Sequence, residues 1–279
     1  MPELPEVEAV AQTLRALVRG KKIRGVHVFH PITTKPQKAA DLASFSTNQT
    51  VHQVTRHGKY LALELTRGIL VLHFRLDGQL LWFSSAKELF SKANEPPHNV
   101  HVDVALELNH GVLGFADCRH FGRVHYFESR QDCAGLQSLG VDALSREFTP
   151  SHFAGLLAAS RRPLKEFLLD QSRVAGIGNI YSCESMWHAL IDPRRRANSL
   201  SKKESAKLHK AIVSVLRRAL ECCLHPAPDF RDPSWWFQGL EQILRAYDLE
   251  DQPCRRCGNL IRRIAQGGRS TYFCSTCQK

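Results

Sequence analysis

Residues 254–277 read CRRCGNLIRRIAQGGRSTYFCSTC, in which two CxxC pairs are separated by 16 residues. This spacing is typical of a four-cysteine zinc site. We expect one structural Zn²⁺ with the ligands Cys254, Cys257, Cys274 and Cys277. Between the pairs, apolar residues flank Gly267-Gly268, which predicts two strands joined by a tight turn. Arg269 would lie near the tip of this hairpin, either as a solvated turn residue or as a contact to a phosphate or a groove.

The positive charge of the chain is concentrated in its second half. Residues 1–150 carry 17 Lys+Arg against 15 Asp+Glu, whereas residues 151–279 carry 21 against 12. Such an excess fits a polyanion such as nucleic acid, because neutralising phosphates releases counterions and drives binding. The alternative is a basic surface that has no partner.

The chain of 279 residues is long enough for two domains with separate cores. It has no run of 18 apolar residues and does not begin with the pattern of a secretion signal. We therefore expect a cytoplasmic protein without a membrane partner. The cysteines outside the zinc motif are typical of thiols in a reducing compartment and receive no role.

The spacing of apolar residues predicts an α+β protein. A helix is predicted over 5–18, and turn residues then separate short β-rich runs that predict an antiparallel β-sandwich. These runs are 23–29, 51–55, 60–65, 69–74, 79–83, 101–108, 112–115 and 123–127. Residues 35–48 and 84–99 are predicted to be polar connections.

The second half has helical patterning after a polar linker around residues 128–150. The predicted helices are 151–160, 163–172, 180–190 and 201–223. Residues 224–240 contain three prolines and two adjacent tryptophans, so we expect an irregular loop or packed connector there.

Two further features point to chemistry. Residues 174–181, VAGIGNIY, form a glycine-containing turn before a helix, which is either a phosphate site with Asn179 as a donor or simply a tight turn. At the start of the chain, removal of Met1 would leave Pro2 with a free secondary amine, a possible nucleophile. Glu3 could then move protons and Glu6 could orient the site; the alternative is an acidic helix start.

In combination, these features resemble the Fpg/Nei family of DNA glycosylases, specifically its formamidopyrimidine-DNA glycosylase branch. The resemblance spans the whole chain. It is carried by MPELPEVE at 1–8, RHGKYL at 56–61, DCRHFG at 117–122, LLDQSRVAGIGNIY at 168–181 and the zinc motif.

The resemblance implies a β-sandwich N-terminal lobe with a catalytic helix, a helix–two-turns–helix lobe and a zinc finger, with DNA held between the lobes. The expected domains are 1–130, a linker at 131–150, 151–250 with a damage-capping loop near 224–240, and the finger at 251–279. We expect a monomer, associated with the nucleoid through its binding of damaged double-stranded DNA.

The resemblance also implies a reaction. Pro2 would attack C1′ of the damaged nucleotide and form a Schiff base, Glu3 would protonate the ring oxygen of the sugar, and Lys59 and Arg269 would assist β- and δ-elimination. The substrates would be oxidised purines, namely 8-oxoguanine and formamidopyrimidines. Zinc would be the only cofactor, with no nucleotide cofactor.

Reaching C1′ requires extruding the nucleotide from the stack, so side chains must fill the space. By position in the family these are Leu76, Arg119 and Phe121, of which Arg119 would also face the opposite base. Without the resemblance, Leu76 and Phe121 would be assigned to core packing. The further expected DNA contacts are His101, Arg161, Lys165 and Asn179.

The chain departs from the family pattern in several places. Leu76 stands where methionine is common, DCRHFG replaces DPRRFG, and the segment at 96–103 leaves the roles of His98 and His101 open. The loop at 224–240 is also unusual in composition. Two other functions therefore remain: a Nei-like glycosylase for oxidised pyrimidines, and a non-catalytic zinc-finger protein that binds damaged or abasic DNA.

Overall fold

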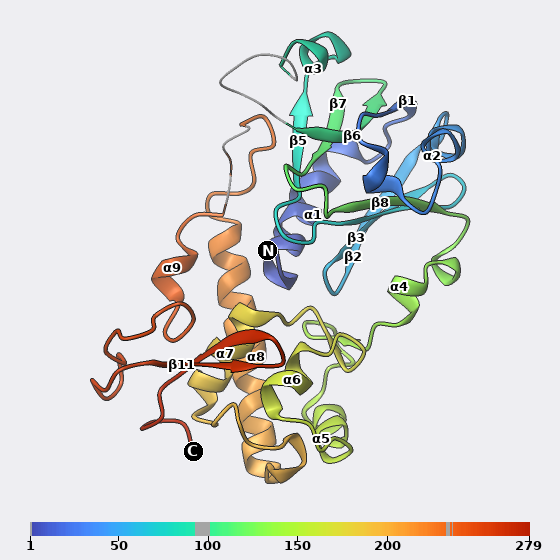
Figure 1. The fold of residues 1–279 in the computed structure, drawn as a ribbon. Coiled ribbons are helices and arrows are strands. Elements are labelled where there is room, and N and C mark those ends of the chain that lie inside the picture. The colour runs from blue at the N-terminus through green and yellow to red at the C-terminus, as the bar shows by residue number, and fades with distance from the viewer. Residues whose placement is uncertain (1, 93–100, 233–234, 236) are drawn as a thin grey trace. The chain divides into compact units, whose positions relative to one another are not determined.

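The computed structural model describes residues 2–92, 101–232, 235 and 237–279 (Figure 1). These residues form two compact units. The first unit contains residues 1–2, 6–137 and 226–237, and the second contains residues 3–5, 138–225 and 238–279.

The first unit contains two four-stranded antiparallel sheets. One has the order β1-β6-β7-β5, formed by β1 (Ile23–Val28), β5 (Gln79–Phe83), β6 (Val102–Leu108) and β7 (Val112–Ala116). The other has the order β2-β3-β4-β8, formed by β2 (Val51–His57), β3 (Tyr60–Leu65), β4 (Ile69–His73) and β8 (Arg123–Phe127). All eight strands coincide closely with the predicted runs.

One hydrophobic core joins both sheets to helix α1 (Leu4–Val18). Val7, Val10 and Leu14 form the buried stripe of this helix. They pack with alternating residues of the strands, such as Leu61 of β3 and Leu106 of β6. Because alternate side chains of a strand point to one face, the two sheets can bury a shared interior, and the predicted sandwich is confirmed.

Two short helices lie in segments that were predicted to be connections. The polar connections expected at 35–48 and 84–99 contain α2 (Ala39–Ser46) and α3 (Ala86–Lys92). Each buries one large apolar side chain, Leu42 in α2 and Leu89 in α3. A single anchor gives no apolar repeat from which a helix could be recognised. Residues 93–100, with His98, lie outside the described residues.

Four helices of the second unit agree with the predicted pattern. They are α5 (Pro150–Ala158), α6 (Leu164–Leu169), α7 (Asn179–Ala189) and α8 (Lys202–Cys223). The one-turn helix α9 (Leu240–Ile243) was not predicted. Ser201 and Glu204 form a capping box that fixes the start of α8. A two-stranded parallel pair, β9 (Val141–Asp142) with β10 (Val174–Ala175), precedes α7.

The remaining short elements lie in connections. They are the 3-10 turns η1 (Pro31–Thr34), η2 (Arg130–Asp132) and η3 (Ala197–Ser199), and the one-turn helix α4 (Ala134–Gln137). No helix among the described residues is long and apolar enough to cross a membrane.

The proline-rich segment after α8 clusters with the first unit. Phe230 is fully buried in the sandwich core, and its carbonyl accepts a hydrogen bond from the backbone N–H of Trp82 at 2.6 Å. Trp235 packs against the Phe230 ring, with 5.8 Å between ring centroids. The position of this segment in the sequence predicts that it belongs to the helical domain, whereas its described residues pack with the sandwich.

The zinc-finger hairpin is formed by β11 (Arg262–Gln266) and β12 (Arg269–Phe273). Gly267 and Gly268 have φ values of +55° and +73°, which the two-residue turn requires and which glycine adopts without strain. Arg269 is therefore the first residue after the turn, as predicted, and it is exposed.

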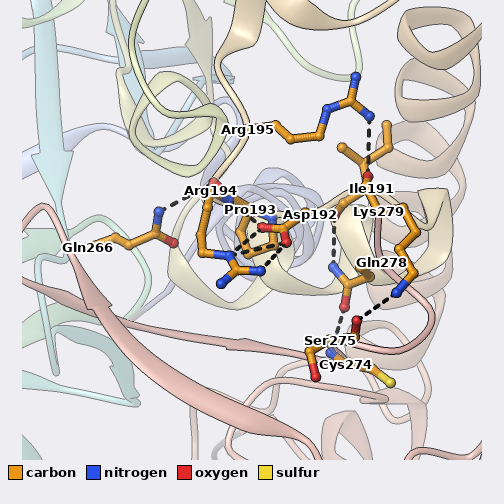
Figure 2. Close-up of polar contacts among 10 residues, drawn as sticks. All are labelled: Ile191, Asp192, Pro193, Arg194, Arg195, Gln266, Cys274, Ser275, Gln278 and Lys279. Carbon is orange, nitrogen blue, oxygen red and sulfur yellow. Dashed lines mark hydrogen bonds and ion pairs between the residues drawn. The ribbon is translucent and has the colours of Figure 1, made fainter.

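The end of the chain is fastened to the segment after α7 (Figure 2). The Gln278 side-chain amide donates to the Ile191 carbonyl at 2.9 Å and accepts from the Cys274 N–H at 2.8 Å. The Asp192 N–H donates to the Lys279 carbonyl at 3.1 Å. These bonds hold the second cysteine pair of the finger against the core of the second unit.

Candidate functional site

The Glu3 carboxylate lies at the N-terminus of α7. It accepts hydrogen bonds from the backbone N–H groups of Gly178 at 2.7 Å, Ile180 at 2.9 Å and Tyr181 at 3.4 Å. A helix leaves its first N–H groups without internal partners, and its dipole favours an anion there. These N–H groups therefore bind an internal carboxylate. The interpretation in which they bind a phosphate is thus corrected.

Pro2 immediately precedes this anchored residue, and Pro2, Glu3 and Glu6 are all buried. The Leu4 N–H donates to the Gly176 carbonyl at 3.1 Å, so the backbone next to Glu3 is held as well as its carboxylate. The start of the chain is therefore fixed in place by the glycine-containing turn at 174–181.

The substitution Gly176→Ala is expected to lower the free energy of unfolding by about 1–3 kcal/mol. Gly176 has φ +103°, and an added Cβ would lie 2.4 Å from Leu4 Cδ1, so both the backbone and Leu4 would have to move. Urea denaturation followed by circular dichroism measures this change.

The matched control is Gly155→Ala in α5, where an added Cβ meets nothing within 4 Å. Alanine is the better helix former by up to about 1 kcal/mol, so this variant should be as stable as the parent or more so. Equal stability of the two variants would show that Gly176 does not fix Leu4.

Lys59 lies in the turn between β2 and β3, and 9% of it is exposed. Nearby His73 of β4 was missed by the sequence analysis. Burial, then the positive charges of Arg75 and Lys59, lower the pKa of His73 to about 3. His73 is therefore neutral at physiological pH. Its Nδ1 accepts from the Arg75 N–H at 3.0 Å, which leaves Nε2 as a hydrogen-bond donor. In the sequence, the only indication of a role for His73 was its position three residues before Leu76.

Leu76, Arg119 and Phe121 lie in two turns of the first unit. An ion pair between Arg119 and Asp77 links these turns. The Arg119 guanidinium carbon is 5.6 Å from the centre of the Phe121 ring, and Phe121 is 49% exposed. Leu76 is half-buried. An exposed aromatic ring beside a guanidinium is unlike a core residue, and it is a suitable shape for insertion into a base stack.

Asp117 organises the turn that carries Arg119 and Phe121. Its carboxylate accepts from the Arg119 N–H at 3.0 Å and from the Gly122 N–H at 2.6 Å. Asp117 is buried, whereas Arg119 and Phe121 are exposed. The buried carboxylate thus fixes the backbone from which the two side chains project.

The predicted DNA contacts differ in exposure. Arg161 and His101 are exposed, and Asn179 is half-buried at the start of α7. Lys165, in contrast, is fully buried. Its ammonium group donates to the Asn179 carbonyl at 3.2 Å, to Ser182 Oγ at 2.8 Å and to Cys183 Sγ at 2.9 Å. The prediction that Lys165 contacts phosphate is therefore wrong, because its ammonium group is buried and bound to partners inside the protein.

The four predicted zinc ligands come together. The sulfur atoms of Cys254, Cys257, Cys274 and Cys277 all lie within 4.8 Å of one another. Tetrahedral coordination at about 2.3 Å per Zn–S bond places sulfur atoms roughly 4 Å apart, so the cluster fits zinc. The site is structural, since all four positions are taken by protein ligands.

Three family models match successive parts of the chain. Residues 1–124 match the formamidopyrimidine-DNA glycosylase N-terminal domain, residues 139–224 match the formamidopyrimidine-DNA glycosylase H2TH domain, and residues 251–279 match the zinc finger found in FPG and IleRS.

Individual proteins are similar over the full length. A formamidopyrimidine-DNA glycosylase from Cytobacillus firmus is 37% identical over 100% of both chains. The Lactococcus lactis Fpg mutant G226P bound to Fapy-dG-containing DNA has a TM-score of 0.86, 29% identity and 100% coverage of both chains. The wild-type Lactococcus lactis Fpg bound to DNA with an oxidised pyrimidine gives the same TM-score, identity and coverage.

Proposed function

This chain belongs to the formamidopyrimidine-DNA glycosylase family, and we propose that it excises oxidised purines through a covalent intermediate on Pro2. It is a DNA glycosylase of base excision repair with one structural zinc. The observation that most supports the proposed chemistry is the anchored Glu3 carboxylate directly after Pro2. A proton-transfer group is thus held in a defined place beside the proposed nucleophile.

The nucleophile is the secondary amine of Pro2 once Met1 has been removed. A terminal amine titrates near ~8, so an appreciable fraction is neutral at cellular pH. Attack on C1′ displaces the damaged base and gives a Schiff base. The Schiff base acidifies the C2′ hydrogen, and β- and then δ-elimination break the backbone on the two sides of the sugar.

Glu3 is the proposed acid for the ring oxygen of the sugar. Its carboxylate is held by three backbone N–H groups at the start of α7, directly after the proposed nucleophile in the chain. Lys59 is the proposed proton donor and phosphate contact in the elimination, and the neutral His73 is a second donor near it. Exposed Arg269 assists δ-elimination and binds phosphate, while Arg161, His101 and Asn179 contact the DNA backbone.

Leu76, Arg119 and Phe121 fill the space that the extruded nucleotide leaves. Phe121 enters the base stack and Arg119 faces the opposite base. Extrusion costs a few kcal/mol, which insertion of these side chains offsets. The exposure of Phe121 and the ion pair that links its turn to the turn of Leu76 support this assignment.

Oxidised pyrimidines are the second candidate substrate class. The structure of wild-type Lactococcus lactis Fpg with oxidised-pyrimidine DNA favours keeping this class, whereas the complex of its mutant with Fapy-dG DNA supports the purine class. Single-turnover excision from matched duplexes that carry Fapy-dG, 8-oxoguanine or an oxidised pyrimidine separates the two. Faster excision of the oxidised pyrimidine would overturn the purine assignment.

Borohydride trapping tests the mechanism. Reduction of a Schiff base on a duplex with 8-oxoguanine should leave a stable protein–DNA adduct that peptide mapping assigns to Pro2. Intact mass should show that Met1 is absent. An unprocessed terminus in active protein, or an adduct on another residue, would overturn the Pro2 assignment. No adduct despite a free proline and tight binding to abasic DNA would favour the non-catalytic alternative.

The substitution Arg119→Ala is expected to reduce the preference for the base opposite the lesion by about tenfold, with a smaller change in overall affinity. The guanidinium is the group that would read the opposite base, and removing it leaves Phe121 in place. Excision rates with each of the four opposite bases measure the preference. The control is Arg24→Ala, an exposed arginine on β1. An unchanged preference in Arg119→Ala would place the guanidinium elsewhere.

A further inference from the structure

His30, Asp103 and His120 form a second cluster of potential metal ligands, separate from the cysteines of the finger. One ligand atom from each residue lies within 4.8 Å of the others. The cluster belongs to the first unit. His30 precedes η1, Asp103 lies on β6, and His120 lies in the turn that carries Arg119 and Phe121.

The distances in this cluster are close to those of ligands that occupy neighbouring positions around one ion. Bonds of about 2.1 Å at right angles would separate a nitrogen and an oxygen ligand by about 3.0 Å and two imidazole centres by about 4.5 Å. The observed distances are 2.7 Å between His120 Nδ1 and Asp103 Oδ1, and 4.3 Å between the centres of the His30 and His120 rings. A small outward movement of the side chains would admit an ion.

The surroundings of Asp103 favour a cation beside its carboxylate. Asp103 is fully buried, and its Oδ2 accepts from Thr33 Oγ1 at 2.6 Å, which leaves Oδ1 directed at His120. A buried carboxylate is costly unless a positive charge or several hydrogen bonds compensate it. Arg123 lies on the other side of the turn, where its guanidinium is bonded to the carbonyl of His120 at 3.1 Å.

The two imidazoles remain accessible to an ion from solvent. The His120 side chain is 30% exposed and His30 is half-buried. Within the described residues, the His30 ring makes no hydrogen bond, so its nitrogens are available as ligands. Two imidazoles with one carboxylate are a donor set that late first-row divalent ions prefer, and water can fill the remaining positions.

We propose that His30, Asp103 and His120 bind one divalent transition-metal ion of the nickel, copper or zinc class. The ion replaces the hydrogen bond between His120 and Asp103 and ties the turn at 117–122 to β6 and to the start of η1. Because Arg119 and Phe121 flank His120, the bound metal restrains the backbone from which both project. This site is independent of the structural zinc and of the proposed reaction.

Nickel binding to the zinc-loaded protein tests the proposal. The protein is incubated with Ni²⁺, desalted, and analysed for nickel and zinc by mass spectrometry. We expect one nickel per chain in addition to the retained zinc, together with a higher melting temperature, because an ion that binds only the folded state stabilises it. His30→Gln and His120→Gln should retain zinc but lose the bound nickel and the shift in melting temperature.

The matched control is His52→Gln, an exposed histidine on β2, which should bind nickel like the parent. The proposal is overturned if the parent binds no nickel, if nickel binds only as zinc is lost, or if His30→Gln binds it as well as His52→Gln. Retained zinc and an unchanged circular dichroism spectrum would show that each variant is folded. None of these readouts depends on excision.

Discussion

Replacing Pro2 with glycine is expected to slow base excision by roughly a thousandfold while duplex binding stays within a few-fold of the parent. Glycine keeps a terminal amine but loses the secondary amine proposed to form the iminium ion, and it loosens the chain before Glu3. Single-turnover excision measures the chemical step, and a binding assay on an abasic-site analogue measures affinity separately.

The control for this experiment is Pro150→Ala, which changes a proline at the start of α5. This variant should excise bases at the parental rate. Intact mass must show the same removal of Met1 in both variants, because a retained Met1 would turn the amine into an amide. Full activity of Pro2→Gly with an adduct on another residue would refute Pro2 as the nucleophile.

Regular elements were predictable where side-chain periodicity and turn residues agreed. The strands of the sandwich are short apolar runs between turn residues such as Gly68 and Gly111, both of which have positive φ. The apolar stripe of α1 repeats over four turns, so it was also evident. In α2 and α3, a single buried leucine sets the orientation of each helix. Their sequences therefore lack the repeated apolar spacing from which a helix is predicted.

The candidate site was predictable in its residue types but not in its pairings. The turn before α7 was interpreted either as a phosphate site or as a tight turn, whereas its N–H groups bind Glu3, which is 175 residues away along the chain. Lys165 is of a residue type that often contacts phosphate, but burial turns its charge toward Ser182 and Cys183. Which partner a charged group meets is decided by tertiary packing, to which local patterns are insensitive.

The segment 226–237 is a second case in which local sequence patterns did not indicate the tertiary contacts. Its sequence position predicts that it belongs to the helical domain. Burial of Phe230 in the sandwich core instead ties the segment to strands more than 100 residues earlier, through the bond to Trp82. A large apolar side chain can be buried by any core within reach of the chain, so the sequence did not determine which one.

The substitution Cys257→Ser is expected to release the zinc and to weaken binding to damaged and undamaged duplexes alike by at least about tenfold. The finger has only a small apolar core, in which Tyr272 and Cys274 pack with Trp187 of α7. Without the metal, the hairpin loses the bonds that join its two ends, and Arg269 is no longer held in place. Elemental analysis gives the zinc content, and the salt dependence of binding gives the number of phosphates that each variant neutralises.

Two variants separate loss of the metal from other effects. Cys222→Ser changes a cysteine of α8 outside the cluster and should keep both zinc and DNA affinity. Arg269→Ala should keep zinc and weaken binding less than Cys257→Ser, because it removes one proposed phosphate contact and leaves the hairpin folded. If Cys257→Ser lost zinc but bound every duplex as tightly as Cys222→Ser, the finger would not contribute to DNA binding. The proposed phosphate contact of Arg269 would then also be refuted.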